Sequence, residues 1–178
     1  MNHNLRNHSD SIMTRFRLYQ YLQNEGLSPK ILNLPAQLDG SEADKNKEIC
    51  KHIEDCELPA ISPDGETLAS SLSGLAKLII ELQTKKHSQR PLKWNKPSPT
   101  IVSLPEDFVH PFMPRTMTVR EMARFQSFPD NFEFRAKETT GSLRRRVEVP
   151  QYTQVGNAVP PLLAEAVGKH IHKILTHY

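Results

Sequence analysis

Apolar residues recur at the three- and four-residue spacing of a helix in three stretches of the chain. These stretches are residues 9–24, residues 67–84 and the segment that follows Asn157. The apolar side of each comprises, in chain order, Ile12, Phe16, Tyr19 and Leu22; Leu68, Leu72, Leu75, Ile79 and Leu82; and Val159, Leu162, Leu163, Ala166, Val167, Ile171 and Ile174. Each stretch therefore predicts an amphipathic helix with one apolar face to bury.

Capping and strand signals predict further elements between these helices. Thr118 and Glu121 have the spacing of a capping box, so a helix is expected to begin at Val119 and to end before Pro129. A shorter helix is predicted over residues 45–53. The run 100–104 alternates in polarity and is β-branched, which predicts a strand.

The end of the chain carries a second set of backbone signals. Residues 135–150 are expected to form a charged loop that leads toward a tight backbone passage at Gly156. Asn157 is expected to cap the closing helix, since Asn is favoured at that position, and Pro160 and Pro161 are tolerated in a first turn. The last helix is therefore expected to begin directly after Asn157.

Charge is distributed unevenly along the 178 residues. The net charge is +3, but residues 39–66 contain nine acids against three lysines, a net charge of −6, which leaves +9 for the remainder. Basic residues gather in residues 85–96 and at residues 144–146. A basic surface with a separate acidic segment suits a DNA-facing protein, and an ordinary solvated surface is the alternative.

Two stretches in the second half of the chain resemble conserved motifs of one enzyme family. Residues 115–134, RTMTVREMARFQSFPDNFEF, and residues 151–166, QYTQVGNAVPPLLAEA, resemble the ninth and tenth motifs of the DNA (cytosine-5)-methyltransferases. The Pro-Ser-Pro-Thr of residues 97–100 and the Asn-His of residues 2–3 are also similar to that family. Residues 36–85 match no motif.

The resemblance implies a fold class and a division of the chain. As an isolated chain the protein is expected to be α+β, with a small target-recognition domain over residues 1–150. Residues 151–178 are expected to leave that domain and to complete the Rossmann-like α/β domain of a catalytic half that the sequence does not contain. The chain is thus similar to the C-terminal half of the family's enzymes.

The residues of the family's covalent chemistry are not found in the sequence. The family's nucleophile is the cysteine of a Pro-Cys pair, whereas Cys50 follows Ile49 and Cys56 follows Asp55. No predicted strand is followed by a glycine-rich turn that offers a site for S-adenosylmethionine. No catalytic residue is therefore assigned, and the chain is not expected to methylate DNA alone. The eight histidines lack metal-binding spacing, so no metal site is expected.

Contacts with DNA are expected from basic and hydroxyl side chains. These are Lys86, Arg90, Lys93, Lys96, Ser98, Thr100, Arg115, Thr118, Arg120, Arg144, Arg145 and Arg146. Arg and Lys suit phosphates and the guanine edge alike. As alternatives, Arg120 and Arg124 form a solvated helix face, and residues 96–100 are ordinary proline-rich loop. Trp94 is favoured as a core anchor over a base-stacking residue.

The tenth motif implies a contact with the cofactor. Asn157, Ala158 and Val159 are expected to touch the carboxylate or methionine end of S-adenosylmethionine, and a turn with a helix cap is the alternative. The chain is interpreted as the DNA-recognising part of a cytosine-C5 methyltransferase, as one polypeptide of a split enzyme or a gene fragment, with duplex DNA and a catalytic half as partners. A DNA-binding regulatory protein and an inert remnant are the alternatives.

The longest apolar run, residues 75–82, is too short to cross a bilayer, so a cytoplasmic, nucleoid-associated protein is expected.

Overall fold

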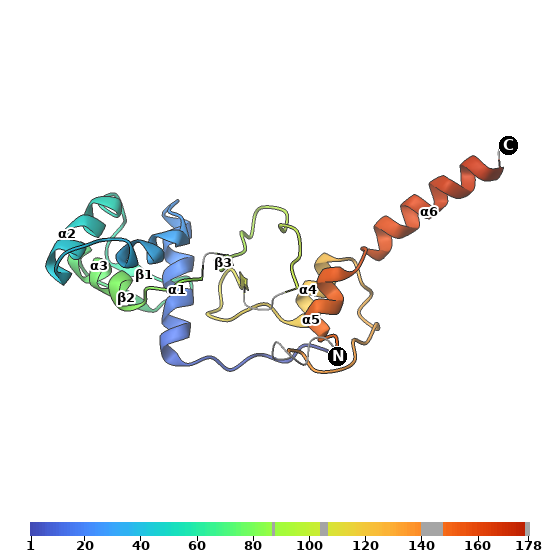
Figure 1. Cartoon of the computed structure of the whole chain (residues 1–178), viewed down its shortest axis with the longest axis horizontal. Helices are drawn as coiled ribbons and strands as arrows, with labels where there is room; N and C mark the ends of the chain where they lie inside the picture. The colour runs from blue at the N-terminus through green and yellow to red at the C-terminus, as the bar shows by residue number, and fades with distance from the viewer. Residues whose placement is uncertain (87, 104–106, 140–147, 177–178) are drawn as a thin grey trace. The chain divides into compact units, whose positions relative to one another are not determined.

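The computed structural model describes residues 1–86, 88–103, 107–139 and 148–176 (Figure 1). The chain forms two compact units, which are described separately. Unit 1 consists of residues 1–6, 95–106 and 117–178, and unit 2 consists of residues 7–94 and 107–116. Neither unit is continuous in sequence, so contacts between distant segments close each of them.

Unit 2 holds most of the regular structure. Its elements are α1 (Asp10–Asn24), the 3-10 helix η1 (Pro29–Ala36), α2 (Glu42–His52), β1 (Ala60–Ile61), β2 (Thr67–Ala69), α3 (Leu72–Glu81), β3 (Arg90–Pro91) and β4 (Phe108–Val109). β1 and β2 pair antiparallel, whereas β3 and β4 pair parallel with Arg90 opposite Phe108. Figure 1 shows α2, α3 and the β1–β2 pair gathered beside α1.

The core of unit 2 is built on the apolar side of α1. Phe16, Tyr19 and Leu22 are fully buried, and they belong to one cluster with Leu75 and Ile79 of α3. Burial of each large apolar side chain contributes about 1.5–3 kcal/mol. The helical periodicity of the sequence therefore identifies the residues that hold this unit together.

The predicted helices of unit 2 are present, and one of them begins later than expected. α1 and α2 lie close to the predicted stretches, but α3 starts only at Leu72. Residues 67–69 form β2 instead, because the turn at Gly65, with φ of +90°, folds them back on β1. The Ser71 hydroxyl then caps α3 by accepting the Gly74 N–H at 3.1 Å.

Unit 1 contains α4 (Val119–Phe125), α5 (Gln151–Asn157) and α6 (Pro161–Thr176). α4 begins where the capping box predicts, but α5 is an element that the sequence did not predict. Asn157 ends α5, so the expectation that it caps the closing helix is wrong. The Ser127 hydroxyl, from a distant part of the chain, accepts the Leu162 N–H in the first turn of α6 at 3.1 Å.

Gly156 lies in α5 and not in the tight passage that was expected. A Cβ at this position would lie 2.7 Å from the backbone nitrogen of Ser103 and 2.8 Å from the carbonyl carbon of Val102. The glycine therefore allows α5 to approach the 101–103 segment closely. The strand predicted over residues 100–104 is absent from residues 100–103, and Leu104 lies outside the described residues.

The mixture of helices and small sheets is consistent with an α+β fold. The boundary expected at residue 150 falls inside unit 1, because α5 packs on α4. In the part of the chain that the structure describes, no helix has both the length and the apolar character needed to cross a membrane.

Candidate nucleic-acid interface and cofactor segment

The capping box at the start of α4 also holds the N-terminal segment. The Thr118 N–H donates to the Glu121 carboxylate at 2.8 Å, and the Glu121 N–H donates to the Thr118 hydroxyl at 3.3 Å. Nδ1 of His3 lies 2.9 Å from the same hydroxyl oxygen. Thr118 is buried, so its hydroxyl serves the protein interior, and the expected contact with DNA is corrected to a structural role.

Arg120 is a buried hub of hydrogen bonds to backbone carbonyls. Its guanidinium donates to the carbonyls of Met1 (3.2 Å), Pro129 (3.1 Å) and Phe132, and the residue is only 4% exposed. The guanidinium carbon lies 6.0 Å from the ring centroid of Phe134. The planar fork of arginine suits such bracing. Arg120 is therefore neither on a solvated helix face nor exposed to a phosphate, and its role is to hold the loop after α4.

Arg124 occupies the solvated face of α4. Its Nε donates to Asp130 Oδ1 at 2.8 Å and its second terminal nitrogen donates to Oδ2 at 2.9 Å, with both side chains exposed. This hydrogen bonding from Arg124 lowers the pKa of Asp130 from its ordinary value. Solvent screens such a pair, so its contribution to stability is small. Arg124 marks the outer side of a helix whose inner side is held by Arg120.

Asn2 links the loop after α4 to α5. Its amide nitrogen donates to the Phe134 carbonyl at 2.8 Å and to the Gln151 side chain at 3.0 Å, while its amide oxygen accepts the Phe134 N–H at 3.0 Å. Asn2 has a φ of 58°, in the left-handed region that asparagine tolerates better than most residues. In the sequence, Asn2 was notable only because the Asn-His of residues 2–3 is similar to the family. In the structure, its hydrogen bonds hold the loop after α4 against α5.

The two stretches that resemble family motifs pack against each other in unit 1. The buried Tyr152 of α5 donates its hydroxyl to the Met117 carbonyl at 2.7 Å. The Gln126 amide, at the end of α4, donates to the Val155 carbonyl at 3.3 Å. The second stretch is therefore fixed to the first through α5 and, at the start of α6, through the hydrogen bond from the Leu162 N–H to the Ser127 hydroxyl.

The three residues expected to touch the cofactor lie at the junction of α5 and α6. Asn157 and Val159 are exposed, and Ala158 is half-buried. The Ala158 N–H donates to the Val155 carbonyl at 3.3 Å, so this donor is not available to a ligand. The exposed amide of Asn157 fits a polar contact with a carboxylate, and Val159 fits an apolar one. Both side chains are accessible, and their assignment to a cofactor contact stays a prediction.

The other residues expected to contact DNA divide between the two units. Lys86, Arg90 and Lys93 are exposed in unit 2, and Lys96, Ser98 and Thr100 are exposed in unit 1. Arg115 is half-buried and donates to the Thr116 carbonyl at 3.1 Å. Arg144, Arg145 and Arg146 lie outside the described residues. The exposed cations before the Pro-Ser-Pro-Thr segment therefore remain the candidates for contact with DNA.

Trp94 lies on the surface and not in the core. It is 78% exposed, and its ring contacts that of Phe112 with centroids 5.2 Å apart. Pro91 and Leu92 are the buried residues of this segment. Pro91 ends β3 and Leu92 follows it, whereas Trp94 is exposed, so the prediction of a core tryptophan is wrong.

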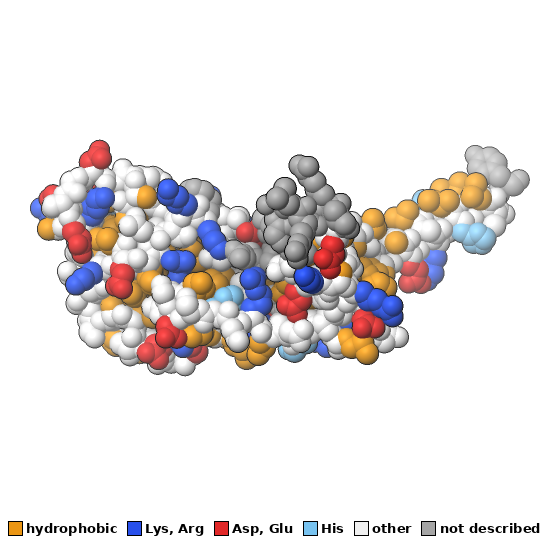
Figure 2. Space-filling model, turned by 60° about the horizontal axis from the view of Figure 1, so that its bottom comes forward, with side chains coloured by type: hydrophobic (Ala, Val, Ile, Leu, Met, Phe, Trp, Pro, Cys, Tyr) orange, Lys and Arg blue, Asp and Glu red, His pale blue; other side chains and the backbone are white. Residues whose placement is uncertain are grey.

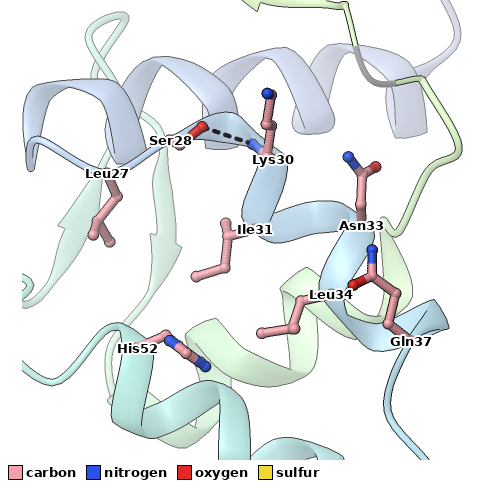
Figure 3. A pocket seen from close by; sticks show the side chains of 8 residues that line it. All are labelled: Leu27, Ser28, Lys30, Ile31, Asn33, Leu34, Gln37 and His52. Carbon is pink, nitrogen blue, oxygen red and sulfur yellow. Dashed lines mark hydrogen bonds between the residues drawn. The ribbon is translucent and has the colours of Figure 1, made fainter.

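A cavity of about 410 Å³ lies in unit 2 beside η1 (Figure 3). Its lining consists of Leu27, Ser28, Lys30, Ile31, Asn33, Leu34, Gln37 and His52. In Figure 3, Ile31 and Leu34 project from η1 toward the side on which His52 of α2 lies. None of the lining residues is an expected contact of DNA or cofactor, so no function is assigned to this cavity.

The apolar face of α6 is exposed along the helix. No residue of α6 is buried, and the large apolar residues of the face are between 47% and 66% exposed. These residues are Leu162, Leu163, Val167, Ile171 and Ile174, whereas Val159, which was expected on this face, precedes the helix. Figure 2 shows hydrophobic side chains running along this helix. A contiguous apolar face in contact with water is typical of a surface that binds a partner.

Comparison with known proteins shows what the chain is similar to. The model of the C-5 cytosine-specific DNA methylases matches residues 7–173. The type II methyltransferase M.AquIB of Picosynechococcus sp. is 41% identical over 126 residues, which are 70% of this chain and 91% of that relative. No solved structure matches the chain.

Two longer relatives match a smaller share of the chain. The type II methyltransferase M.DdeI of Desulfomicrobium norvegicum is 47% identical over 87 residues, or 48% of this chain. The type II methyltransferase M.AgeI of Thalassovita gelatinovora is 43% identical over 97 residues, or 52% of this chain. The chain spans only 20% of the length of each of these two, in contrast to its coverage of M.AquIB.

Proposed function

Since the chain belongs to the family of C-5 cytosine-specific DNA methylases, we propose that it is the DNA-recognising part of such an enzyme. It acts together with a catalytic half, whose Rossmann-like domain α6 completes. The observation that carries this proposal is the apolar face of α6, on which no residue is buried. An exposed apolar surface of this size is typical of a site that binds another protein surface, and in this family we propose that the catalytic half supplies it.

The short length of one relative supports the proposal that a chain of this size is one part of a methyltransferase. The alignment with M.AquIB covers 91% of a protein that is itself named a type II methyltransferase. The chain covers only 20% of M.DdeI, which has room for further domains. We therefore propose that the chain is one polypeptide of a split enzyme. A catalytically inactive DNA-binding or regulatory remnant is the alternative.

Duplex DNA is the proposed substrate, and the exposed cations are its proposed contacts. A cytosine inside a duplex has to leave the base stack before its ring is accessible, and this costs a few kcal/mol. Attraction of phosphates to side chains such as Lys86, Arg90 and Lys93 offsets that cost. Arg120 acts indirectly, since its bonds to three carbonyls keep the loop after α4 in one shape.

The junction of α5 and α6 is proposed to form one wall of the cofactor site. S-adenosylmethionine supplies the methyl group in this family. The Asn157 amide would donate to the cofactor's carboxylate, and Val159 would supply an apolar contact beside it. Because the junction leads directly into α6, docking of α6 on the catalytic half would bring both residues to that half.

The test is reconstitution of methyl transfer. The purified chain is mixed with a catalytic half from the same genome, one that carries the cofactor and Pro-Cys motifs, and labelled methyl groups on DNA are counted. We expect transfer by the mixture and none by this chain alone. Leu163→Asp should abolish transfer by placing a charge in a buried seam. His172→Asp, on the opposite side of α6, should leave it intact.

Two outcomes would contradict parts of the proposal. Methyl transfer by this chain alone would show that the covalent chemistry lies within these residues. Salt-dependent binding to DNA, without association with any catalytic half, would favour the regulatory alternative.

A further inference from the structure

Trp94 and Phe112 form an exposed aromatic pair on unit 2. Trp94 is 78% exposed and Phe112 is 44% exposed, and the two rings meet with centroids 5.2 Å apart at an angle of 55°. Trp94 is the only tryptophan in the sequence. Aromatic rings supply large apolar area and usually lie buried, so two exposed rings in contact, inclined to each other, present an unusual apolar surface to solvent.

The turn that carries Phe112 is held rigidly. Nδ1 of His110 accepts the backbone N–H groups of Phe112 and Met113, both at 3.1 Å. The buried Gln20 of α1 donates its amide to the carbonyls of His110 (2.6 Å) and Met113 (2.8 Å). The ring of Phe112 is therefore preorganised on a fixed turn, so little conformational entropy is lost when a ligand binds it.

The chemistry around the pair suits a polyanion. Residues 88–94 contain two cations, Arg90 and Lys93, and no acid, while the neighbouring Asp107 carboxylate accepts the Ser88 hydroxyl at 2.7 Å. Lys93 is exposed directly before Trp94, and Arg90 lies on the β3–β4 pair with its guanidinium carbon 5.8 Å from the ring centroid of Phe108. Flat rings beside cations are the combination that binds nucleic-acid bases by stacking and phosphates by charge.

We propose that Trp94 and Phe112 are a stacking platform for a base that becomes unpaired when the target cytosine leaves the duplex. The proposal rests on the proposed function, because it requires that unit 2 faces DNA. Every base has a flat π face, so such a platform binds an unpaired base without regard to sequence. It would lower the cost of opening the duplex at the target, while the cations hold the strand beside it.

The test uses the full chain and three DNA probes at low salt. These are a fully paired duplex, the same duplex with one unpaired base, and a single strand. Since Trp94 is the sole tryptophan, quenching of intrinsic tryptophan fluorescence reports stacking on its ring directly. We expect strong quenching with the last two probes and weak quenching with the paired duplex.

Variants separate stacking from charge and from folding. Trp94→Ala should weaken binding of the duplex with an unpaired base by roughly tenfold and change the paired duplex little, while Trp94→Phe should retain most of the preference. Lys93→Ala should weaken both duplexes and reduce the dependence on salt. Phe125→Ala, which removes an exposed ring of unit 1, is the matched control and should change neither affinity. Circular dichroism establishes that each variant is folded.

Three results would overturn the inference. Equal binding of both duplexes, with no effect of Trp94→Ala, would reject the platform while leaving recognition of DNA intact. Normal DNA binding by Trp94→Ala, together with loss of association with the catalytic half, would make the pair a protein-docking surface. Failure of the wild-type chain to bind any of the probes would reject the proposed recognition of DNA together with the platform.

Discussion

Replacing Gly156 with alanine places one methyl group where α5 meets the 101–103 segment. The new Cβ would lie 2.7 Å from the Ser103 nitrogen and 2.8 Å from the Val102 carbonyl carbon, and both are backbone atoms that cannot rotate away. Overpacking of this kind costs about 1–3 kcal/mol, and the higher helix propensity of alanine returns up to about 1 kcal/mol. We expect a net loss of about 1–2 kcal/mol, which lowers Tm by roughly 2–8 °C.

Gly168 provides the matched control for this substitution. A Cβ at Gly168 would meet nothing within 4 Å, and the residue lies in the exposed helix α6. Gly168→Ala should therefore leave Tm unchanged and slightly raise helicity, by the propensity term alone. Thermal unfolding followed by circular dichroism measures both variants. Equal Tm values for the two would refute the close approach of α5 to the 101–103 segment.

Further substitutions test single residues in each unit. Arg120→Met removes the donors to three carbonyls and should cost about 2–4 kcal/mol in urea unfolding; an unchanged midpoint would mean that the side chain does not brace the loop. Asn157→Ala should weaken S-adenosylmethionine binding by the assembled pair roughly tenfold in isothermal titration without lowering Tm; the opposite pattern would leave Asn157 with a structural role alone. Burial alone would raise the pKa of Asp64, but hydrogen bonds from Ser62 and Arg17 outweigh it and hold the pKa below its ordinary value. The Asp64 carboxylate therefore stabilises unit 2 above about pH 4, and this gain is lost as the pH falls through the folded-state pKa. Asp64→Asn should lower stability by about 1 kcal/mol near neutral pH and converge with the wild type in acid; a difference that persists in acid would contradict the assignment.

Sequence patterns were sufficient where the deciding contacts are local. The capping box of Thr118 and Glu121 joins residues three apart, and α4 begins where it predicts. The apolar periodicity of residues 9–24 likewise identifies α1 and its buried face. Both signals depend on neighbours within one helical turn, which the sequence displays directly.

Long-range contacts decided the features that the sequence did not predict. Arg120 sits at a position that suits an exposed helical cation, but the carbonyls of Met1 and of the loop after α4 accept its hydrogen bonds. The run 100–104 alternates as a strand does, yet the backbone that it meets belongs to Gly156 in a helix. Trp94 has the large apolar ring that is typical of a core residue, but the buried residues near it in the chain are Pro91 and Leu92. In each case the deciding partner lies elsewhere in the fold.

The contacts of Asn2 have a consequence for the order in which the protein folds. Its hydrogen bonds to Phe134 and Gln151 span 132 and 149 positions of the chain. Unit 2 uses no residue beyond Thr116, so we expect it to become resistant to protease on ribosome-bound chains before unit 1 does. Asn2 cannot complete its contacts until Gln151 has been synthesised, and closing so long a loop is slow. Residues 1–6 precede unit 2 in the chain, yet they are expected to complete their contacts after unit 2 has folded.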